Sequence, residues 1–161
     1  MHDHAPQPLS KLLSALTTGP FLLASAIGQS RRGCRVRWVQ PCSDDPPMVM
    51  LSVRKGAPTA PLIRDSRHFA LSRITIDNAL IRRFVDQPQL PADFDESHEH
   101  EIDPFIGIDM VKTAHGQPRL RSCSLWIECE VVRHVDIESD FELYVGLVLA
   151  GERLDDGCIA R

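Results

Sequence analysis

The chain has 161 residues, of which 43% are hydrophobic and 25% charged, proportions that are ordinary for a globular protein and exclude an intrinsically disordered chain. Its net charge of −4 lacks the overall basic excess of a typical nucleic-acid-binding domain. No apolar stretch approaches the roughly 18 residues of a membrane-spanning helix, so we expect neither nucleic acid nor membrane among its partners.

The N-terminal residues predict a short helix. Four leucines are spaced for one helical face, and Gly19-Pro20 would end the helix after them. These leucines are Leu9, Leu12, Leu13 and Leu16. The length fits one domain over residues 1–161, with loose ends expected at 1–8 and 155–161.

Strand-like patterns dominate the next part of the chain. The apolar run 21–27 predicts a buried strand, and the polar residues 29–33 predict a turn. Apolar and basic side chains alternate in 34–40, which predicts a strand with one face turned inward. Asp-Asp-Pro-Pro at 44–47 predicts a break, because proline cannot donate to a strand ladder. A further apolar strand is expected over 48–53.

The middle of the chain mixes turns, short helices and one strand. Two prolines in 56–61 predict a turn, followed by a short helix over 62–67 and a strand over 69–74. Asp77 is a suitable N-cap for a helix that ends near residue 85. The acidic stretch 86–104 has little periodicity, which predicts a long surface excursion within the domain.

The C-terminal part predicts more strands. Residues 106–113 are a candidate strand before a turn at 115–118, and 123–132 alternate cleanly between two faces. A last strand is expected over 143–149. Several short strands with turn signals and few helices predict a mostly β, antiparallel barrel or sandwich, and the flanking helices disfavour a pure sandwich.

The cysteines and the N-terminus indicate the compartment. Five is an odd number, and no Cys-x-x-Cys pair occurs, which favours reduced thiols over a disulfide framework or a zinc site. No basic segment precedes an apolar one at the N-terminus, so we predict no signal peptide and a cytoplasmic location. The cysteines are Cys34, Cys42, Cys123, Cys129 and Cys158.

Clusters of basic residues and of histidines are candidates for an anion site and a metal site. Residues 31–83 carry eleven Lys and Arg against four Asp and Glu, whereas 84–161 carry six against seventeen. The basic half predicts either a local anion site or scattered solvated arginines. His98 and His100 lie in an acidic stretch without a third ligand at fixed spacing, so we predict no metal site, and His68 is expected to be a satisfied, partly buried histidine.

Residues 33–55 resemble the flavin reductase-like, FMN-binding split-barrel family. The shared features are a glycine, Trp38-Val39, the corner Ser43-Asp44-Asp45-Pro46-Pro47 and an apolar strand over 48–53. The similarity continues through Leu62-Ile63-Arg64-Asp65-Ser66, Phe69-Ala70-Leu71, Asp103-Pro104-Phe105, residues 125–132 and Tyr144-Val145-Gly146. It therefore covers about residues 15–155, with the pieces in the order that the family has them.

The resemblance implies a six-stranded antiparallel Greek-key split barrel with short flanking helices, and FMN at the interface of a homodimer. The flavin ring would lie along the strand that holds Gly33, Cys34, Arg35, Val36, Arg37 and Trp38. The phosphate would lie near Cys42, Ser43, Lys55 and Thr59, although Ser43 and Thr59 also suit ordinary turns. NAD(P)H would be the electron donor of a flavin reductase, and no catalytic residue is predicted because the cofactor carries the chemistry.

The sequence departs from the family pattern at two places. Around the glycine, Arg32, Arg35 and Arg37 stand where the family often has asparagine and small or hydroxyl residues, and Phe141 stands where family members have the histidine of Gly-Asp-His. Two arginines on one strand face suit a carboxylate or phosphate, hence an altered substrate or a second small anionic ligand. These departures leave a second hypothesis open: a non-catalytic split-barrel module that binds flavin or another anion.

Overall fold

The structure, a computed structural model, describes residues 8–9, 12, 20–75, 84 and 103–154. Most of the helices expected over 9–16 and 77–85 lies outside the described residues, as do nearly all of the acidic excursion and of the two loose ends. Among the described residues, no helix combines the length and the hydropathy that a bilayer crossing requires.

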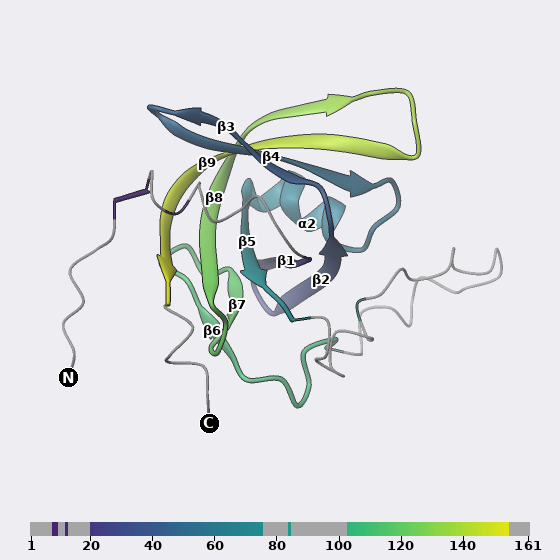
Figure 1. Cartoon of the computed structure of the whole chain (residues 1–161). Helices are drawn as coiled ribbons and strands as arrows, with labels where there is room; N and C mark the ends of the chain where they lie inside the picture. Colours follow the sequence, from purple (N-terminus) through teal and green to yellow (C-terminus); the bar gives the residue numbers. More distant parts are fainter. Residues whose placement is uncertain (1–7, 10–11, 13–19, 76–83, 85–102, 155–161) are drawn as a thin grey trace, which may run out of the picture.

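The described chain is mostly β, as predicted, and seven antiparallel strands form one curved sheet (Figure 1). The strand order is β2-β1-β5-β8-β9-β4-β3. A second, two-stranded sheet pairs β6 with β7. The strands are β1 Phe21–Ile27, β2 Ser30–Val36, β3 Val39–Asp44, β4 Pro47–Arg54, β5 His68–Arg73, β6 Met110–Lys112, β7 Pro118–Leu120, β8 Leu125–Asp136 and β9 Phe141–Arg153. Helix α2, Thr59–Ser66, packs mainly against β1, β2 and β5.

The large sheet has seven strands instead of the expected six because residues 34–40 do not form one strand. Val36 ends β2 and Val39 begins β3, and both side chains are buried. Two inward side chains three residues apart break the two-residue period of a strand, so the chain turns at residues 37–38. The polar turn expected over 29–33 is wrong as well, since β1 and β2 are joined by the two-residue turn Gly28-Gln29.

The first strand is buried on both of its faces. Phe21 and Leu23 point into the main core, which α2 helps to cover with Ile63. Leu22 and Ala24 point to the opposite face, into a second cluster with Ile74, Phe84 and Phe105. Burial on both faces explains why residues 21–24 form a continuous apolar run without alternation.

The longest strands, β8 and β9, form the hairpin that joins the two halves of the sheet. The alternation predicted for 123–132 is confirmed, since Leu125, Ile127, Cys129 and Val131 all enter the main core, and the register shift at Cys129 comes from an extra residue on β9. The Glu128 side chain is fully buried, where the Thr113 hydroxyl and the His115 backbone N–H donate to it. The strand expected over 106–113 is shorter than predicted, since only Met110–Lys112 pairs.

Candidate functional site

A pocket of about 240 Å³ lies where the β2–β3 link meets β4 and the start of β9. The pairing of β4 with β9 sets Arg54 opposite Phe141, and the Ser52 backbone N–H donates to the Trp38 carbonyl at 3.1 Å. Along β4 the odd-numbered side chains from Val49 to Val53 enter the core, so Ser52 and Arg54 face the other way. The lining consists of Arg35, Val36, Arg37, Trp38, Ser52, Arg54 and Phe141.

A second pocket of about 380 Å³ adjoins the first one. The two share Arg37, Trp38 and Ser52, so they lie side by side at the β3–β4 hairpin, and we call the two together the hollow. The second pocket adds mostly uncharged side chains to this hollow. They are Val39, Gln40, Met50 and Leu51.

Two aromatic rings stand at the edge of this hollow. The Trp38 side chain is 61% exposed, and its ring meets that of Phe141 edge-on, with centroids 5.0 Å apart and an interplanar angle of 62°. An exposed indole offers a planar apolar surface with one hydrogen-bond donor. The arrangement is suited to contact with a flat, partly polar ring.

Three arginines give the first pocket its charge. Arg35, Arg37 and Arg54 line it, and no Asp or Glu of the described ranges joins them. Within the described part of the chain, none of their guanidinium groups has a hydrogen-bond or ion-pair partner, and the Nε of Arg35 is buried without one. A buried donor without a partner is costly, so a ligand acceptor at this place would be stabilised.

Cys34 and Thr59 meet on the inner side of the sheet. The Cys34 thiol and the Thr59 hydroxyl lie 3.2 Å apart, which links β2 to the first residue of α2. Burial raises the pKa of the Cys34 thiol to about 11, and the hydrogen bond with Thr59 only partly opposes this. The thiol is therefore neutral near pH 7, and neither residue lines the two pockets.

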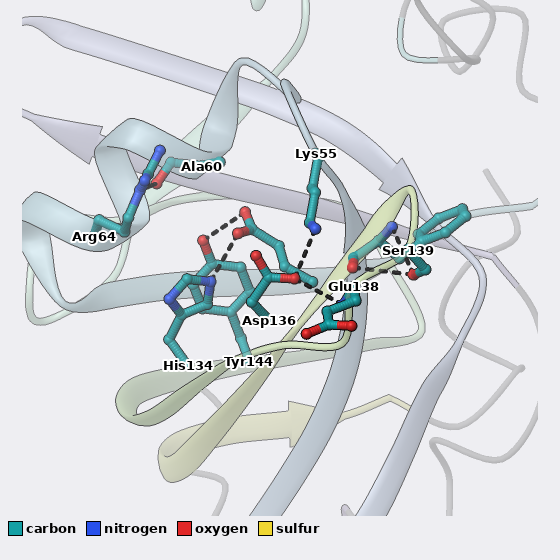
Figure 2. A network of polar contacts seen from close by, with 10 residues as sticks. Lys55, Ala60, Arg64, His134, Asp136, Glu138, Ser139 and Tyr144 are labelled. Carbon is teal, nitrogen blue, oxygen red and sulfur yellow. Dashed lines mark hydrogen bonds and ion pairs between the residues drawn. The ribbon is translucent and has the colours of Figure 1, made fainter.

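Lys55 faces the β8–β9 connection (Figure 2). Its Nζ lies 2.6 Å from Asp136 Oδ1, and its backbone N–H donates to the carbonyl of Asp140 at 2.9 Å. The Lys55 hydrogen bond, together with one from the Glu138 N–H, holds the pKa of the Asp136 carboxyl below its usual range. Lys55 therefore has an acidic partner already and is absent from the pocket lining.

The remaining predicted residues lie elsewhere. Gly33 is buried against Phe105 of the second cluster. Cys42 and Ser43 lie on β3 near the turn at Asp45-Pro46, at the end of the hairpin away from the pocket, and their role as phosphate ligands stays a prediction.

The structure thus brings together four of the ten predicted site residues: Arg35, Val36, Arg37 and Trp38. It adds Ser52, Arg54 and Phe141, which the sequence analysis did not assign to the site. In the sequence, Ser52 and Arg54 alternate with the core residues of β4, and this alternation indicates that both side chains face away from the core.

A polar network lies on the opposite face of β9 from Phe141 (Figure 2). The Tyr144 hydroxyl donates to Glu142 at 2.9 Å, and His134 Nε2 lies 2.7 Å from the same carboxylate. The rings of His134 and Tyr144 stack with centroids 4.7 Å apart. Burial, followed by the bond to Glu142, raises the pKa of Tyr144, so the phenol stays protonated as the donor.

Other titratable clusters in the part of the chain that the structure describes show no ligand geometry. His68 stacks on His115 at 4.7 Å and lies with its Nδ1 2.8 Å from the Ser66 carbonyl, away from the pocket. Over the described residues, no group of three or more His, Cys, Asp and Glu side chains is arranged to hold a metal ion. His98 and His100 lie outside the described residues.

Comparison with known families gives one match over most of the chain. The family described as "Flavin reductase like domain" matches residues 13–158. Among curated proteins, "Putative diflavin flavoprotein A 1" of Nostoc sp. is 25% identical over 138 residues, which are 84% of this chain and 22% of that protein. The chain thus spans about a fifth of the length of the curated relatives that it matches.

Solved structures show the same fold at low identity. The nitrilotriacetate monooxygenase component B homologue of Mycobacterium thermoresistibile has a TM-score of 0.71 at 20% identity, covering 86% of this chain and 70% of that one. The NADH:FAD oxidoreductase of Streptomyces globisporus has a TM-score of 0.70 at 23% identity, covering 85% and 76%. That oxidoreductase has also been solved in complex with NAD and FAD fragments.

Proposed function

Because this chain belongs to the flavin reductase-like domain family, we propose that it is an FMN-binding oxidoreductase that transfers hydride between NAD(P)H and flavin. The observation that carries the proposal is the hollow made up of the two adjoining pockets, which share Arg37, Trp38 and Ser52. It lies along the strand segment on which the family resemblance sets the flavin ring.

The residues of the hollow suit the parts of FMN. The Trp38 and Phe141 rings offer apolar edges for a planar ring, and the uncharged side chains of the second pocket, such as Met50, extend that surface. The unpaired donors of Arg35 and its neighbours suit an anionic group. When bound, the flavin would supply the hydride-accepting ring, and the protein would orient it and limit its access to water.

We further propose that residues 1–161 form one domain, that two copies associate, and that the protein works in the cytoplasm. The hollow is open, and Trp38 at its edge is largely exposed, so a second copy would cover apolar surface there. Val135 and Ile137 on the β8–β9 hairpin are exposed apolar side chains as well. A homodimer would also shield the bound ring from solvent.

The absorbance spectrum of the purified protein tests this function. We expect flavin absorbance with FMN bound, and loss of that absorbance when NADH or NADPH is added without oxygen. Comparison of the two nucleotides identifies the donor. A protein that binds neither FMN nor riboflavin when either is added would contradict the proposed function.

A second candidate is a non-catalytic module that holds flavin or another anion. Arg35 and Arg37 on the strand and Phe141 in place of the expected histidine favour it, because these side chains alter the side of the site where a nicotinamide would approach. Protein that binds FMN but keeps its flavin absorbance in excess NADH and NADPH would support this alternative.

A further inference from the structure

The arginines of the first pocket differ from other arginines that the structure describes. Arg31 pairs with Asp103 at 2.5 Å, and Arg121 pairs with Asp109 at 2.9 Å. The pocket arginines instead lie together, and no carboxylate from residues 20–75 or 103–154 lines the pocket with them. None of the acidic residues that the structure describes lines this pocket, which leaves a local positive charge that an anion would neutralise.

The Nε of Arg35 gives an independent indication of a ligand. This atom is buried and has no hydrogen-bond partner among the described residues, while the side chain lines the pocket. A buried charged donor without an acceptor is unfavourable, and an oxyanion in the pocket would remove that cost. Arg35 therefore combines a buried donor that lacks a partner with a position in the lining of the basic pocket.

The number and shape of these cations select the chemical class of the anion. Guanidinium groups bind planar oxyanions through paired N–H donors, and a phosphate monoester offers two charges and three terminal oxygens. A monocarboxylate would leave most of the charge of three arginines unbalanced. The Trp38 and Phe141 rings and the adjoining second pocket supply the surface for an aromatic ring in the same ligand as that phosphate.

We propose that Arg35, Arg37 and Arg54 form a subsite for the phosphate monoester of a nucleotide, and that this subsite makes the chain prefer phosphorylated over unphosphorylated ligands. The proposal rests on the proposed function for the identity of the ring. Two nucleotides of that reaction carry such a group, namely FMN at its ribityl end and NADPH at its adenosine ribose.

Two ligand pairs separate the sources of the phosphate. FMN is compared with riboflavin, and NADPH with NADH, by equilibrium titration of the wild-type protein and of the double variant R37Q/R54Q. Both substituted side chains are exposed, so we expect the variant to fold, and its thermal unfolding is measured as a check. Arg121→Gln removes a charge from a surface ion pair away from the pocket and serves as the matched control.

For each pair, the ratio compared is the affinity for the phosphorylated ligand divided by the affinity for its unphosphorylated partner. We expect at least one of these two ratios to reach about tenfold in the wild type, to fall to near one in R37Q/R54Q, and to persist in R121Q. The ligand pair that shows the tenfold ratio identifies which nucleotide supplies the phosphate. Affinity for riboflavin or NADH should change little, because neither carries the phosphate in question. A variant with lysine at both positions should keep part of the ratio, since charge remains but the paired donors are lost.

The proposal is overturned if neither ratio exceeds about twofold in the wild type, or if the ratio survives in R37Q/R54Q. Absence of binding for both FMN and riboflavin is a different result. It would contradict the proposed function, and the ratio of NADPH to NADH affinity would then decide the subsite alone.

Discussion

At the scale of the residue, close packing leaves no room for a side chain at Gly33. A Cβ at this position would lie 2.8 Å from the Phe105 ring and 3.0 Å from the Phe84 ring, and both phenylalanines are buried. We predict that Gly33→Ala lowers the free energy of unfolding by about 1–3 kcal/mol, the usual cost of overpacking, in chemical denaturation. Cys42→Ala, at an exposed position of the sheet, is the control and should change stability by less than about 0.5 kcal/mol.

The cysteines should differ in reactivity according to burial. Burial raises the pKa of Cys34 to about 11 and raises that of Cys129 well above its ordinary value, whereas Cys42 is exposed. Because the thiolate is the reactive form, we predict that iodoacetamide at about pH 8 modifies Cys42 before Cys34 and Cys129. Mass spectrometry of timed samples measures this order. Labelling of Cys34 as fast as Cys42 in the native protein, and not only in denaturant, would contradict it.

The sequence alone predicted part of the site at this scale. Arg35, Arg37 and Trp38 were assigned from the resemblance, and they line the pocket. Arg54 and Phe141 were missed because they become neighbours only through the register of β4 with β9, which no local pattern encodes. Phe141 was noticed as a departure from the family, but that difference alone did not give its position beside Trp38.

At the scale of the element, strands were easier to predict than their ends. The run Phe21–Ile27 was predicted with its observed bounds because its continuous apolar character stands out. The break between β2 and β3 was missed, since an apolar–basic alternation fits Cys34 to Trp38 up to the turn itself. The useful signal was the three-residue spacing of Val36 and Val39.

The ion pair between Arg31 of β2 and Asp103 should make stability depend on pH. The Arg31 hydrogen bonds, helped by the Phe105 N–H, hold the pKa of the Asp103 carboxyl below its usual range. A lowered pKa gives stability that is present above the unfolded value of about 3.9 and is lost as the pH falls through the folded value.

We therefore predict that Asp103→Asn destabilises the protein at about pH 6 and that this difference shrinks towards about pH 3. Because a third of each side chain is exposed, solvent screening limits the effect to about 1 kcal/mol or less. Urea denaturation of both proteins across this range measures it. A difference that stays constant with pH would show that the variant acts through packing of Phe105 instead.

At the scale of the whole molecule, local patterns predicted the class and the resemblance predicted the family fold. Mostly β, antiparallel architecture followed from short strands and turn signals. The strand order did not, because β4 lies beside β9 and β5 lies beside β8, pairs that are distant in sequence. Such non-local pairing is set by the packing of the complete core and leaves little local signal.

Association of two copies should depend on Trp38. Its 61% exposed side chain lies at the edge of the hollow that the proposed second copy covers. We predict that Trp38→Ser raises the dissociation constant of the dimer at least about tenfold, as loss of a central aromatic anchor does. Sedimentation velocity over a range of concentrations measures it. Ile106→Ser, at another exposed apolar position, should leave association unchanged.

The position of β1 has a consequence for local opening. This strand is paired along both edges, with β2 and β5, and both of its faces are covered by apolar clusters. Release of its amide hydrogens therefore requires the loss of a neighbouring strand, either β5 or the edge strand β2, together with opening of the apolar clusters that cover its faces. In hydrogen–deuterium exchange, the amides of Leu22 to Ala24 should be among the slowest, and their rate should report the global free energy of unfolding.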